Sequence, residues 1–281
     1  MKISIVIPVY NEATQLGACL SAIAAQTAVP YEVIVVDNNS TDASAVVAGS
    51  FDFVTVLREA KQGVLHARTR GFDAARGDII ARIDADSLLP ADWLSKVRAA
   101  FADPSVDSVS GAALYYNVAA AGLFNAIDLF FRRRLSWQLQ DRVFLWGANM
   151  AIRREAWLKT KPALCNGGGI HEDYDIAIHL QELGGRVIFD ERLEARVSSR
   201  RIDVGYLSFM RYAWVSPRTY AQHGIKTYWH MYPVMLVCAV GYLPARVLHR
   251  GYDPVTDRFV WSKVFAPAAA LPRVDPTANV V

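Results

Sequence analysis

Residues 3–12 of the chain read Ile-Ser-Ile-Val-Ile-Pro-Val-Tyr-Asn-Glu, and this stretch sets the fold expected for the first hundred residues. Ile3–Val9 is a short, nearly continuous apolar run rich in β-branched residues, which predicts a strand buried on both faces of a sheet. Strand and helix signals alternate after it, so we expect an α/β fold with a mainly parallel central sheet and helices on both faces. The expected strands are Ile3–Val9, Glu32–Asp37, Val54–Leu57 and Ile79–Ile83, and the expected helices are Thr14–Gln26, Asp42–Ala48, Val64–Ala75 and Ala91–Ala102.

The regular alternation of strand and helix signals ends after Ala102, where Asp103-Pro104 breaks the helical pattern. Further strands are expected at Val106–Leu114, Ala148–Arg153 and Val187–Asp190, with a short helix ending at Thr160 and a helix at Glu172–Leu183. Between them, Asn117–Leu139 is long and aromatic and contains three consecutive arginines. We divide the chain into residues 1–115 and 116–225, two halves of one domain, followed by residues 226–281. This last part combines an apolar, helical segment with a loose tail that contains prolines.

The composition excludes several classes of protein. The chain has 281 residues, of which 30 are Lys or Arg and 27 are Asp or Glu, so a net charge of +3 argues against a dedicated nucleic-acid binder. A 53% apolar and 20% charged composition excludes a largely disordered chain. Three widely spaced cysteines argue against a disulfide framework or a cysteine-rich zinc site and fit a reducing cytoplasm.

Two stretches are apolar enough to contact lipid, and the mean hydropathy of +0.15 is high for a soluble protein. Thr227–Ala245 carries no charge but contains two prolines and a histidine, which argues against a clean membrane span. Ala112–Phe131 is followed by Arg132, Arg133 and Arg134, a pattern typical of a helix lying in the membrane interface. Packing of both stretches on the protein core is the alternative. Because the N-terminus lacks the features of a secretory signal, we expect the catalytic part in the cytoplasm or on the cytoplasmic face of a membrane.

Acidic residues follow three of the predicted strands, at the sheet edge where open α/β folds bind ligands. Glu12 follows the first strand, Asp37 ends the second, and Asp84-Ala85-Asp86 follows the fourth. Two carboxylates at this spacing can serve one Mg²⁺ or Mn²⁺ ion, which prefers oxygen ligands and commonly bridges to phosphates. A solvated turn that caps the next helix is the alternative for the same residues.

Two further features carry potential chemistry. Arg68, in a predicted helix, is suited to pair with a phosphate or with an aspartate of the metal site, although a surface arginine is the alternative. Glu172, Asp173 and Asp175 open another helix, where acids also complement the helix dipole. A carboxylate there could act as a general base toward a hydroxyl. Because helical neighbours point ~100° apart, we do not expect both Glu172 and Asp173 to face one reacting centre.

These residues resemble the family-two glycosyltransferases, which are inverting enzymes of the GT-A fold. The resemblance rests on five motifs in order, between about Lys2 and Ser199. They are Ser4–Glu12, Val35–Asp42, Ala81–Asp86, Gly147–Glu155 and Glu172–Asp175. The motifs identify a family but not a substrate.

The resemblance implies a role for each matching position. Residues 1–115 would be the half that binds the nucleotide-sugar, and residues 116–225 the half that binds the acceptor. Asn149 would lie near the acceptor. Pro8, Tyr10 and Glu12 would line the nucleotide pocket, and Asp37 would hydrogen-bond the nucleotide base. Arg68 would face the diphosphate, and Asp84 would lie near the ribose and the donor sugar. Asp86 would hold the metal ion, and Asp173 would be the catalytic base.

The chain departs from the family pattern at three places. Asn38 stands where many relatives have a second acid. Phe209–Trp214 lacks the Gln-x-x-Arg-Trp pattern of processive synthases, so we expect transfer of a single sugar. Arg200 and Arg201 stand where many relatives have a histidine, and they could neutralise the leaving diphosphate. A solvated basic turn is the alternative reading of these two arginines.

Together these observations predict a metal-dependent inverting glycosyltransferase that uses a nucleotide-diphospho-sugar and Mg²⁺ or Mn²⁺. The expected acceptor is a lipid-linked or cell-envelope glycan, with a peripheral membrane contact and no nucleic-acid partner. Sugar transfer onto a polyprenyl phosphate is the nearest alternative. A sugar-phosphate nucleotidyltransferase and a non-catalytic homologue acting as a binding subunit are alternatives from other classes. The glycine-rich loop expected of the nucleotidyltransferase is missing from Pro8–Glu12, and the presence of Asp86 and Asp173 argues against the non-catalytic homologue.

Overall fold

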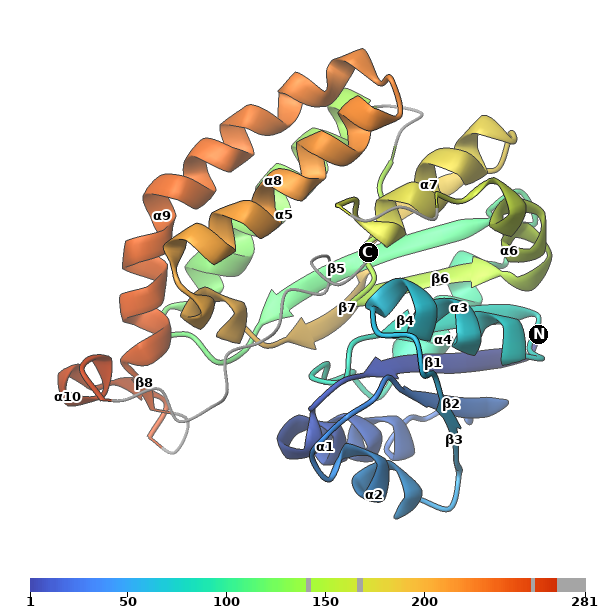
Figure 1. Cartoon of the computed structure of the whole chain (residues 1–281), viewed down its shortest axis with the longest axis horizontal. Coiled ribbons are helices and arrows are strands. Elements are labelled where there is room, and N and C mark those ends of the chain that lie inside the picture. The colour runs from blue at the N-terminus through green and yellow to red at the C-terminus, as the bar shows by residue number, and fades with distance from the viewer. Residues whose placement is uncertain (140–142, 166–168, 254–255, 267–281) are drawn as a thin grey trace.

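A computed structural model describes residues 1–139, 143–165, 169–253 and 256–266 of the chain (Figure 1). A seven-stranded sheet in the order β3-β2-β1-β4-β6-β5-β7 forms its centre. The strands are β1 (Ile3–Val9), β2 (Glu32–Asp37), β3 (Val54–Arg58), β4 (Ile79–Ile83), β5 (Ser108–Tyr115), β6 (Asn149–Arg153) and β7 (Val187–Val197), with β8 (Tyr252–Asp253) and β9 (Arg258–Phe259) forming a separate hairpin.

The helices cover the sheet and build an additional layer beside it (Figure 1). The α-helices are α1 (Ala13–Ala24), α2 (Ser44–Gly49), α3 (Val64–Ala74), α4 (Trp93–Ala100), α5 (Ala121–Leu139), α6 (Arg154–Thr160), α7 (Glu172–Glu182), α8 (Tyr206–Gln222), α9 (Tyr232–Arg250) and α10 (Trp261–Val264). Short 3₁₀ helices lie at η2 (Lys161–Ala163), η3 (Arg200–Val204) and η4 (Lys226–Met231).

The sheet is mainly parallel, as the alternation of strands and helices predicts. The pairs β1–β2, β1–β4, β2–β3 and β5–β7 are parallel, whereas β6 runs antiparallel to both of its neighbours, β4 and β5. The carboxyl ends of β1, β2 and β4 therefore meet at one edge, and Val9 stands directly opposite Asp37. This edge positions the polar residues that follow each strand.

Two hydrophobic cores explain the continuous apolar pattern of β1. Ile3, Ile5 and Ile7 pack on one face of the sheet against α1 and α4, while Val6 packs on the other face against α3, α6 and α7. The side chains of β1 are therefore buried on both faces of the sheet. The prediction of helices on both faces is confirmed.

A third layer is formed by α5, α8, η4 and α9, which lie side by side beyond β5 and β7 (Figure 1). Its small core contains Leu135 of α5, Phe144, Tyr220 of α8 and Met231 of η4. The apolar segment expected at Thr227–Ala245 is split into η4 and α9, and α9 continues to Arg250. The expected division near residue 115 falls at the end of β5 and stays a prediction. The tail beyond Ala266 lies outside the described residues.

Strand β7 is longer than the sequence predicts, because it continues from Asp190 to Val197. Charged residues such as Glu191 and Arg192 interrupt the apolar pattern there. An edge strand tolerates such charges because one of its sides carries no further strand. The pairing with β5 also shifts register between Gly111 and Ala112, which carries β7 past the charged segment.

Candidate active site

Two of the acidic residues that follow the strands, Glu12 and Asp86, meet around one arginine, Arg200. Asp86, only 3% exposed, lies 3.0 Å from Nη2 of Arg200, and its Oδ2 also accepts a hydrogen bond from Nε at 3.1 Å. The same guanidinium forms an ion pair with Glu12, which follows β1. Residues separated by more than a hundred positions in the chain thus form one cluster of two carboxylates and one cation.

An open pocket of about 470 Å³, a volume that includes space open to solvent, lies beside this cluster. It is formed at the end of β4, the loop before β6, the first turn of α7, η3 and α8. Its lining residues are Val64, Arg82, Asp84, Trp146, Gly147, Ala148, His171, Glu172, Asp173, Arg201 and Tyr212. The structure therefore brings together Asp84 and Asp173, which the sequence places in different motifs.

Asp173 is buried at the start of α7 and is held by the backbone. Its Oδ2 accepts a hydrogen bond from the Gly147 N–H at 2.7 Å, and its Oδ1 accepts one from the Tyr174 N–H at 2.9 Å. Burial and the negative charge of Glu172 raise the pKa of Asp173 to about 7, against the lowering effect of Arg82 and of these two donors. A carboxyl group with this pKa can accept a proton near neutral pH.

Glu172 also lines the pocket but is engaged by two arginines. It forms ion pairs with Arg82 and, at 3.1 Å, with Nε of Arg68. Burial alone would raise the pKa of Glu172, but Arg82 and Arg68 hold it below its ordinary value. Glu172 and Asp173 both line the pocket, and the expectation that only one of them faces the reacting centre stays a prediction. Their surroundings separate them, because the pKa of Glu172 is lowered by two arginines and the pKa of Asp173 is raised by burial.

Arg82 is a site residue that sequence reasoning missed. It lies in β4, is buried, and places Nη2 3.6 Å from Oδ1 of Asp84 while it pairs with Glu172. Burial would lower its pKa, but Glu172, Asp84 and Asp173 raise it above its ordinary value, so the guanidinium is fixed as a cation. The available signal was an arginine inside the otherwise apolar strand Ile79–Ile83, where an unpaired charge would be costly.

Arg68 lies beneath the pocket and does not line it. Its side chain is fully buried, pairs with Glu172, and packs with its guanidinium carbon 5.1 Å from the ring centroid of Trp157. The side chain is buried because one face of α3 packs against β1 and β2. Arg68 therefore supports Glu172 from within the protein, and its expected position on the diphosphate side stays a prediction.

The remaining candidates lie at the sheet edge or in the core. Pro8 and Tyr10 are half-buried at the end of β1, and Asp37 is buried, with its Oδ1 accepting a hydrogen bond from the Ser40 N–H at 3.2 Å. Asn149 is fully buried, where its amide donates to the carbonyl oxygens of Ala112 and Leu193. Asn149 therefore fastens β5, β6 and β7 together rather than facing an acceptor.

Asn38 explains one departure from the family pattern. Its side-chain amide donates to the carbonyl oxygens of Glu59 at 3.0 Å and Lys61 at 2.7 Å, and its Oδ1 accepts from the Gly63 N–H at 2.7 Å. A carboxylate at this position could not donate to either carbonyl oxygen. Asn38 thus fixes the loop between β3 and α3.

Comparison with known proteins shows the family of the chain. The family described as glycosyl transferase family 2 matches residues 4–159, which is more than half of the chain. Glycosyltransferase AglE of Haloferax volcanii is 28% identical over 179 residues, covering 60% of this chain and 59% of that protein. A PGL/p-HBAD biosynthesis glycosyltransferase of Mycobacterium bovis is 37% identical over 145 residues, covering 48% of this chain and 56% of that protein. The matched region thus spans less than two thirds of these relatives.

Solved structures share the fold. A mannosyltransferase of Pyrobaculum calidifontis, determined in complex with GDP-Man and Mn²⁺, has a TM-score of 0.61 and 22% identity and covers 88% of this chain and 72% of that one. Glucosyl-3-phosphoglycerate synthase of Mycobacterium tuberculosis, determined with Mn²⁺, UDP-glucose and phosphoglyceric acid, has a TM-score of 0.54 and 20% identity and covers 80% of both chains. With its GT-A fold and its ordered motifs, the chain belongs to glycosyl transferase family 2.

Proposed function

We propose that this chain transfers a single sugar, with inversion, from a nucleotide-diphospho-sugar to a hydroxyl group of a lipid-linked or cell-envelope glycan. The observation that carries the proposal is the shared pocket of Asp84 and Asp173, in which Asp173 has a pKa of about 7. The two structural relatives were determined with nucleotide-sugars and Mn²⁺, which supports a donor and a cation of these classes.

The proposed reaction needs one base and one displacement. Asp173 takes the proton of the acceptor hydroxyl while that oxygen forms a bond to the anomeric carbon. The bond between the anomeric carbon and the phosphate oxygen breaks, and its electron pair leaves with the nucleoside diphosphate. Because attack and departure occur on opposite sides of the carbon, the product is inverted. No second carboxylate is needed, and Glu172 remains paired with Arg82 and Arg68 throughout.

The carboxylates beside the pocket fit a divalent cation. Asp86 and Glu12 are buried, and Arg200 already supplies a positive charge between them. Asp86, with Asp84 beside it, would hold Mg²⁺ or Mn²⁺ through oxygen atoms, and the ion would neutralise the diphosphate of the leaving group. Arg200 would then be free to turn toward the same phosphates, in agreement with the role expected for the arginines of this segment.

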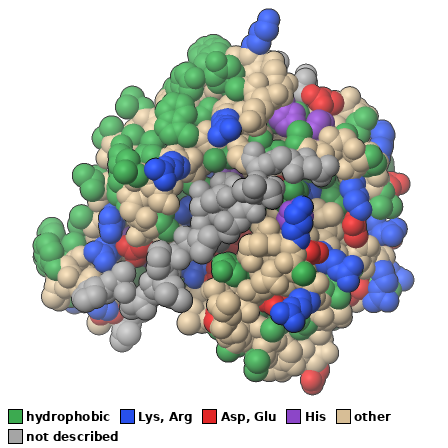
Figure 2. Space-filling model, in the orientation of Figure 1, with side chains coloured by type: hydrophobic (Ala, Val, Ile, Leu, Met, Phe, Trp, Pro, Cys, Tyr) green, Lys and Arg blue, Asp and Glu red, His purple; other side chains and the backbone are tan. Residues whose placement is uncertain are grey.

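The third layer offers a surface for the membrane contact. Exposed apolar side chains recur at i, i+4 and i+7 on α5 (Leu123, Ile127, Phe130) and on α9 (Leu236, Val240, Leu243). Figure 2 shows hydrophobic side chains gathered over the α8–α9 side of the molecule, at the upper left of the view. Trp214, Trp229 and Trp261 are also exposed, and tryptophan is enriched at membrane interfaces. We propose that this surface rests on the cytoplasmic face of a membrane and presents the pocket to a lipid-linked acceptor.

The proposed contact is peripheral. Among the described residues one helical stretch, Lys226–Arg250, is long and apolar enough to span a membrane, and 22% of its most apolar window is buried in the protein. This stretch packs along α8 and η3, so it is already part of the folded layer. Two of the three arginines expected to attract anionic lipids are paired with acids, Arg132 with Asp128 and Arg133 with Glu191. We therefore expect apolar contacts to dominate and salt to weaken binding only slightly.

A donor panel tests the transferase proposal. Thermal shift and nucleoside diphosphate release are measured with UDP-, GDP- and dTDP-sugars in the presence of Mg²⁺ or Mn²⁺, with a lipid-linked glycan or a polyprenyl phosphate as acceptor. One preferred donor and metal-dependent release with the glycan acceptor support the proposal, with one sugar added per acceptor. Turnover only on the polyprenyl phosphate would replace the acceptor class. Full activity in excess EDTA would refute the metal requirement.

Liposome flotation tests the membrane contact. The wild type should float with the vesicles and be released by alkaline carbonate, whereas Leu236→Ser combined with Leu243→Ser should stay at the bottom. The matched control replaces Val29 and Val46, which are equally exposed but lie in the sheet half, by serine. Retention in the carbonate pellet would indicate a span, and equal flotation of both double variants would refute the proposed surface.

A further inference from the structure

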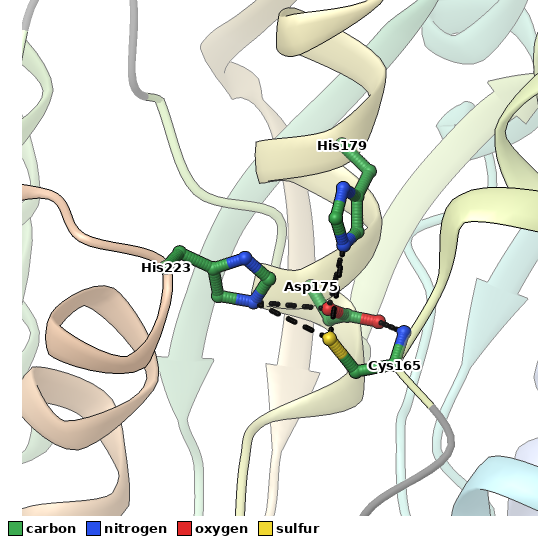
Figure 3. A group of neighbouring side chains, drawn as sticks. All are labelled: Cys165, Asp175, His179 and His223. Atoms are coloured by element: carbon green, nitrogen blue, oxygen red, sulfur yellow. Dashed lines mark hydrogen bonds and ion pairs between the residues drawn. The ribbon is translucent and has the colours of Figure 1, made fainter.

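Four side chains outside the pocket converge on one point (Figure 3). Cys165 precedes α7, Asp175 and His179 lie one turn apart on α7, and His223 directly follows α8. Each offers one ligand atom, and these four atoms all lie within 4.8 Å of one another. The segments are brought together only by the packing of α7 against α8.

The distances between these atoms match those around a tetrahedral zinc ion. With Zn–N and Zn–O bonds of ~2.0–2.2 Å and a Zn–S bond of ~2.3 Å, neighbouring ligand atoms lie about 3.3–3.6 Å apart. Sγ of Cys165 lies 3.8 Å from Nε2 of His179 and 4.0 Å from Nε2 of His223. Oδ1 of Asp175 lies 3.4 Å and 3.0 Å from the same two nitrogens. A small contraction would place an ion at bonding distance from all four.

The orientation of His223 excludes a proton relay from the Cys165 thiol through this histidine to the Asp175 carboxylate. In such a relay one ring nitrogen faces the thiol and the other faces the acid. Here Nε2 of His223 approaches both Cys165 and Asp175, as Figure 3 shows. The four atoms therefore point to a common centre, which is the arrangement of a ligand set.

One oxygen of the cluster depends on the two histidines. Asp175 is fully buried, and among the described residues its Oδ1 makes no regular hydrogen bond but faces Nε2 of His223 at 3.0 Å and Nε2 of His179 at 3.4 Å. A buried carboxylate oxygen is costly unless a cation or a protonated imidazole satisfies it. A metal ion at the centre would satisfy it and would explain why two ring nitrogens and a sulfur surround it.

The contacts around the ligands hold them in place. Oδ2 of Asp175 accepts the Cys165 N–H at 3.0 Å, which leaves Oδ1 for the centre. Nδ1 of His179 lies 3.0 Å from Oε2 of Glu182, which leaves Nε2 for the centre. A carboxylate on the distal nitrogen of a histidine is the usual support of a zinc ligand.

We propose that Cys165, Asp175, His179 and His223 bind a structural Zn²⁺ ion, distinct from the cation expected at Asp86. A thiolate with two imidazoles selects Zn²⁺ over Mg²⁺ or Mn²⁺, and four protein ligands leave no open position for catalysis. The ion ties the segment before α7 and the end of α8 to the helix whose first turn carries Asp173. The proposal does not depend on the glycosyltransferase reaction.

Metal analysis of the purified full chain tests the site. After dialysis against EDTA under reducing conditions, the wild type should retain one zinc per chain, because a closed four-ligand site releases zinc slowly. Cys165→Ser and His223→Gln should lose it. Cys238→Ser and His230→Gln, a thiol and an imidazole outside the cluster, should keep it, as should Asp86→Ala. Equal zinc in Cys165→Ser and wild type would overturn the proposal.

Cobalt substitution keeps the test decisive if the variants fold poorly. Wild-type protein stripped with a stronger chelator and refilled with Co²⁺ should show intense tetrahedral bands in the visible and a thiolate-to-cobalt band in the near ultraviolet. Added Zn²⁺ should bleach both bands and raise the melting temperature. Wild-type protein that contains no zinc, and that gains neither cobalt bands nor thermal stability from added metal, would also overturn the proposal.

Discussion

Replacing Asp173 by asparagine separates catalysis from folding, because the change removes a charge and keeps the size of the side chain. The pKa of Asp173 rises from its ordinary 3.8 to about 7 in the folded chain, through burial first and the charge of Glu172 second. A difference of this size corresponds to on the order of 4 kcal/mol, since one pKa unit is ~1.4 kcal/mol.

The sign of the stability effect follows from the direction of the pKa. A carboxyl group whose pKa is raised by folding is ionised at a cost in the folded state, so the wild type loses stability as the pH rises from about 4 to about 7. Asparagine has no such cost. The free energy of unfolding of Asp173→Asn should therefore rise relative to the wild type by a few kcal/mol across this interval. Asparagine also loses one of the two backbone hydrogen bonds, but this adds an offset that is largely independent of pH.

Kinetics and denaturation at several pH values provide the assay. Wild-type kcat/KM should climb as Asp173 ionises and level off above pH ~7, whereas Asp173→Asn should bind nucleotide normally and lose kcat by ~10²–10⁴. Exposed Asp52→Asn, between α2 and β3, is the control and should change neither profile. Near wild-type turnover in Asp173→Asn, or a stability difference that stays constant with pH, would refute the reasoning.

Three further changes address other parts of the site. Asp86→Ala should abolish transfer and the metal-dependent part of nucleotide affinity, as measured by calorimetry with and without Mn²⁺; unchanged metal dependence would contradict this. Gly147→Ala should displace the Arg82 side chain, because the new methyl group would lie 2.4 Å from its Nη1, and kcat should fall. Wild-type kinetics of this variant would contradict a fixed position of Arg82. Asn38→Asp should lower the free energy of unfolding by ~1–2 kcal/mol in urea, since the carbonyl oxygens of Glu59 and Lys61 lose their donor, and a loss within experimental error would contradict the proposed fastening of the β3–α3 loop.

The sequence alone was sufficient for the fold class and for part of the site. The continuous apolar run Ile3–Val9 indicates a strand that is buried on both faces, and this signal lies within seven consecutive residues. Three strands, β1, β2 and β4, have the bounds that the sequence predicts. Polar residues that follow parallel strands must share an edge, so the position of Glu12 and Asp86 at one edge of the sheet follows from topology. Family membership follows from ordered motifs, which are also local.

Tertiary structure decided the environment of each charge. Glu172 and Asp173 are neighbours of similar acidity in the sequence, and only their tertiary surroundings shift their pKa values in opposite directions. Arg82 and Arg68 lower the pKa of Glu172, whereas burial and the charge of Glu172 raise that of Asp173. The four proposed zinc ligands span residues 165–223 without a recognisable spacing, because two of them lie outside α7. The pKa of a group and its suitability as a ligand depend on burial and on partners within a few ångströms. Those partners are set by helix packing between distant segments, which a local sequence pattern does not encode.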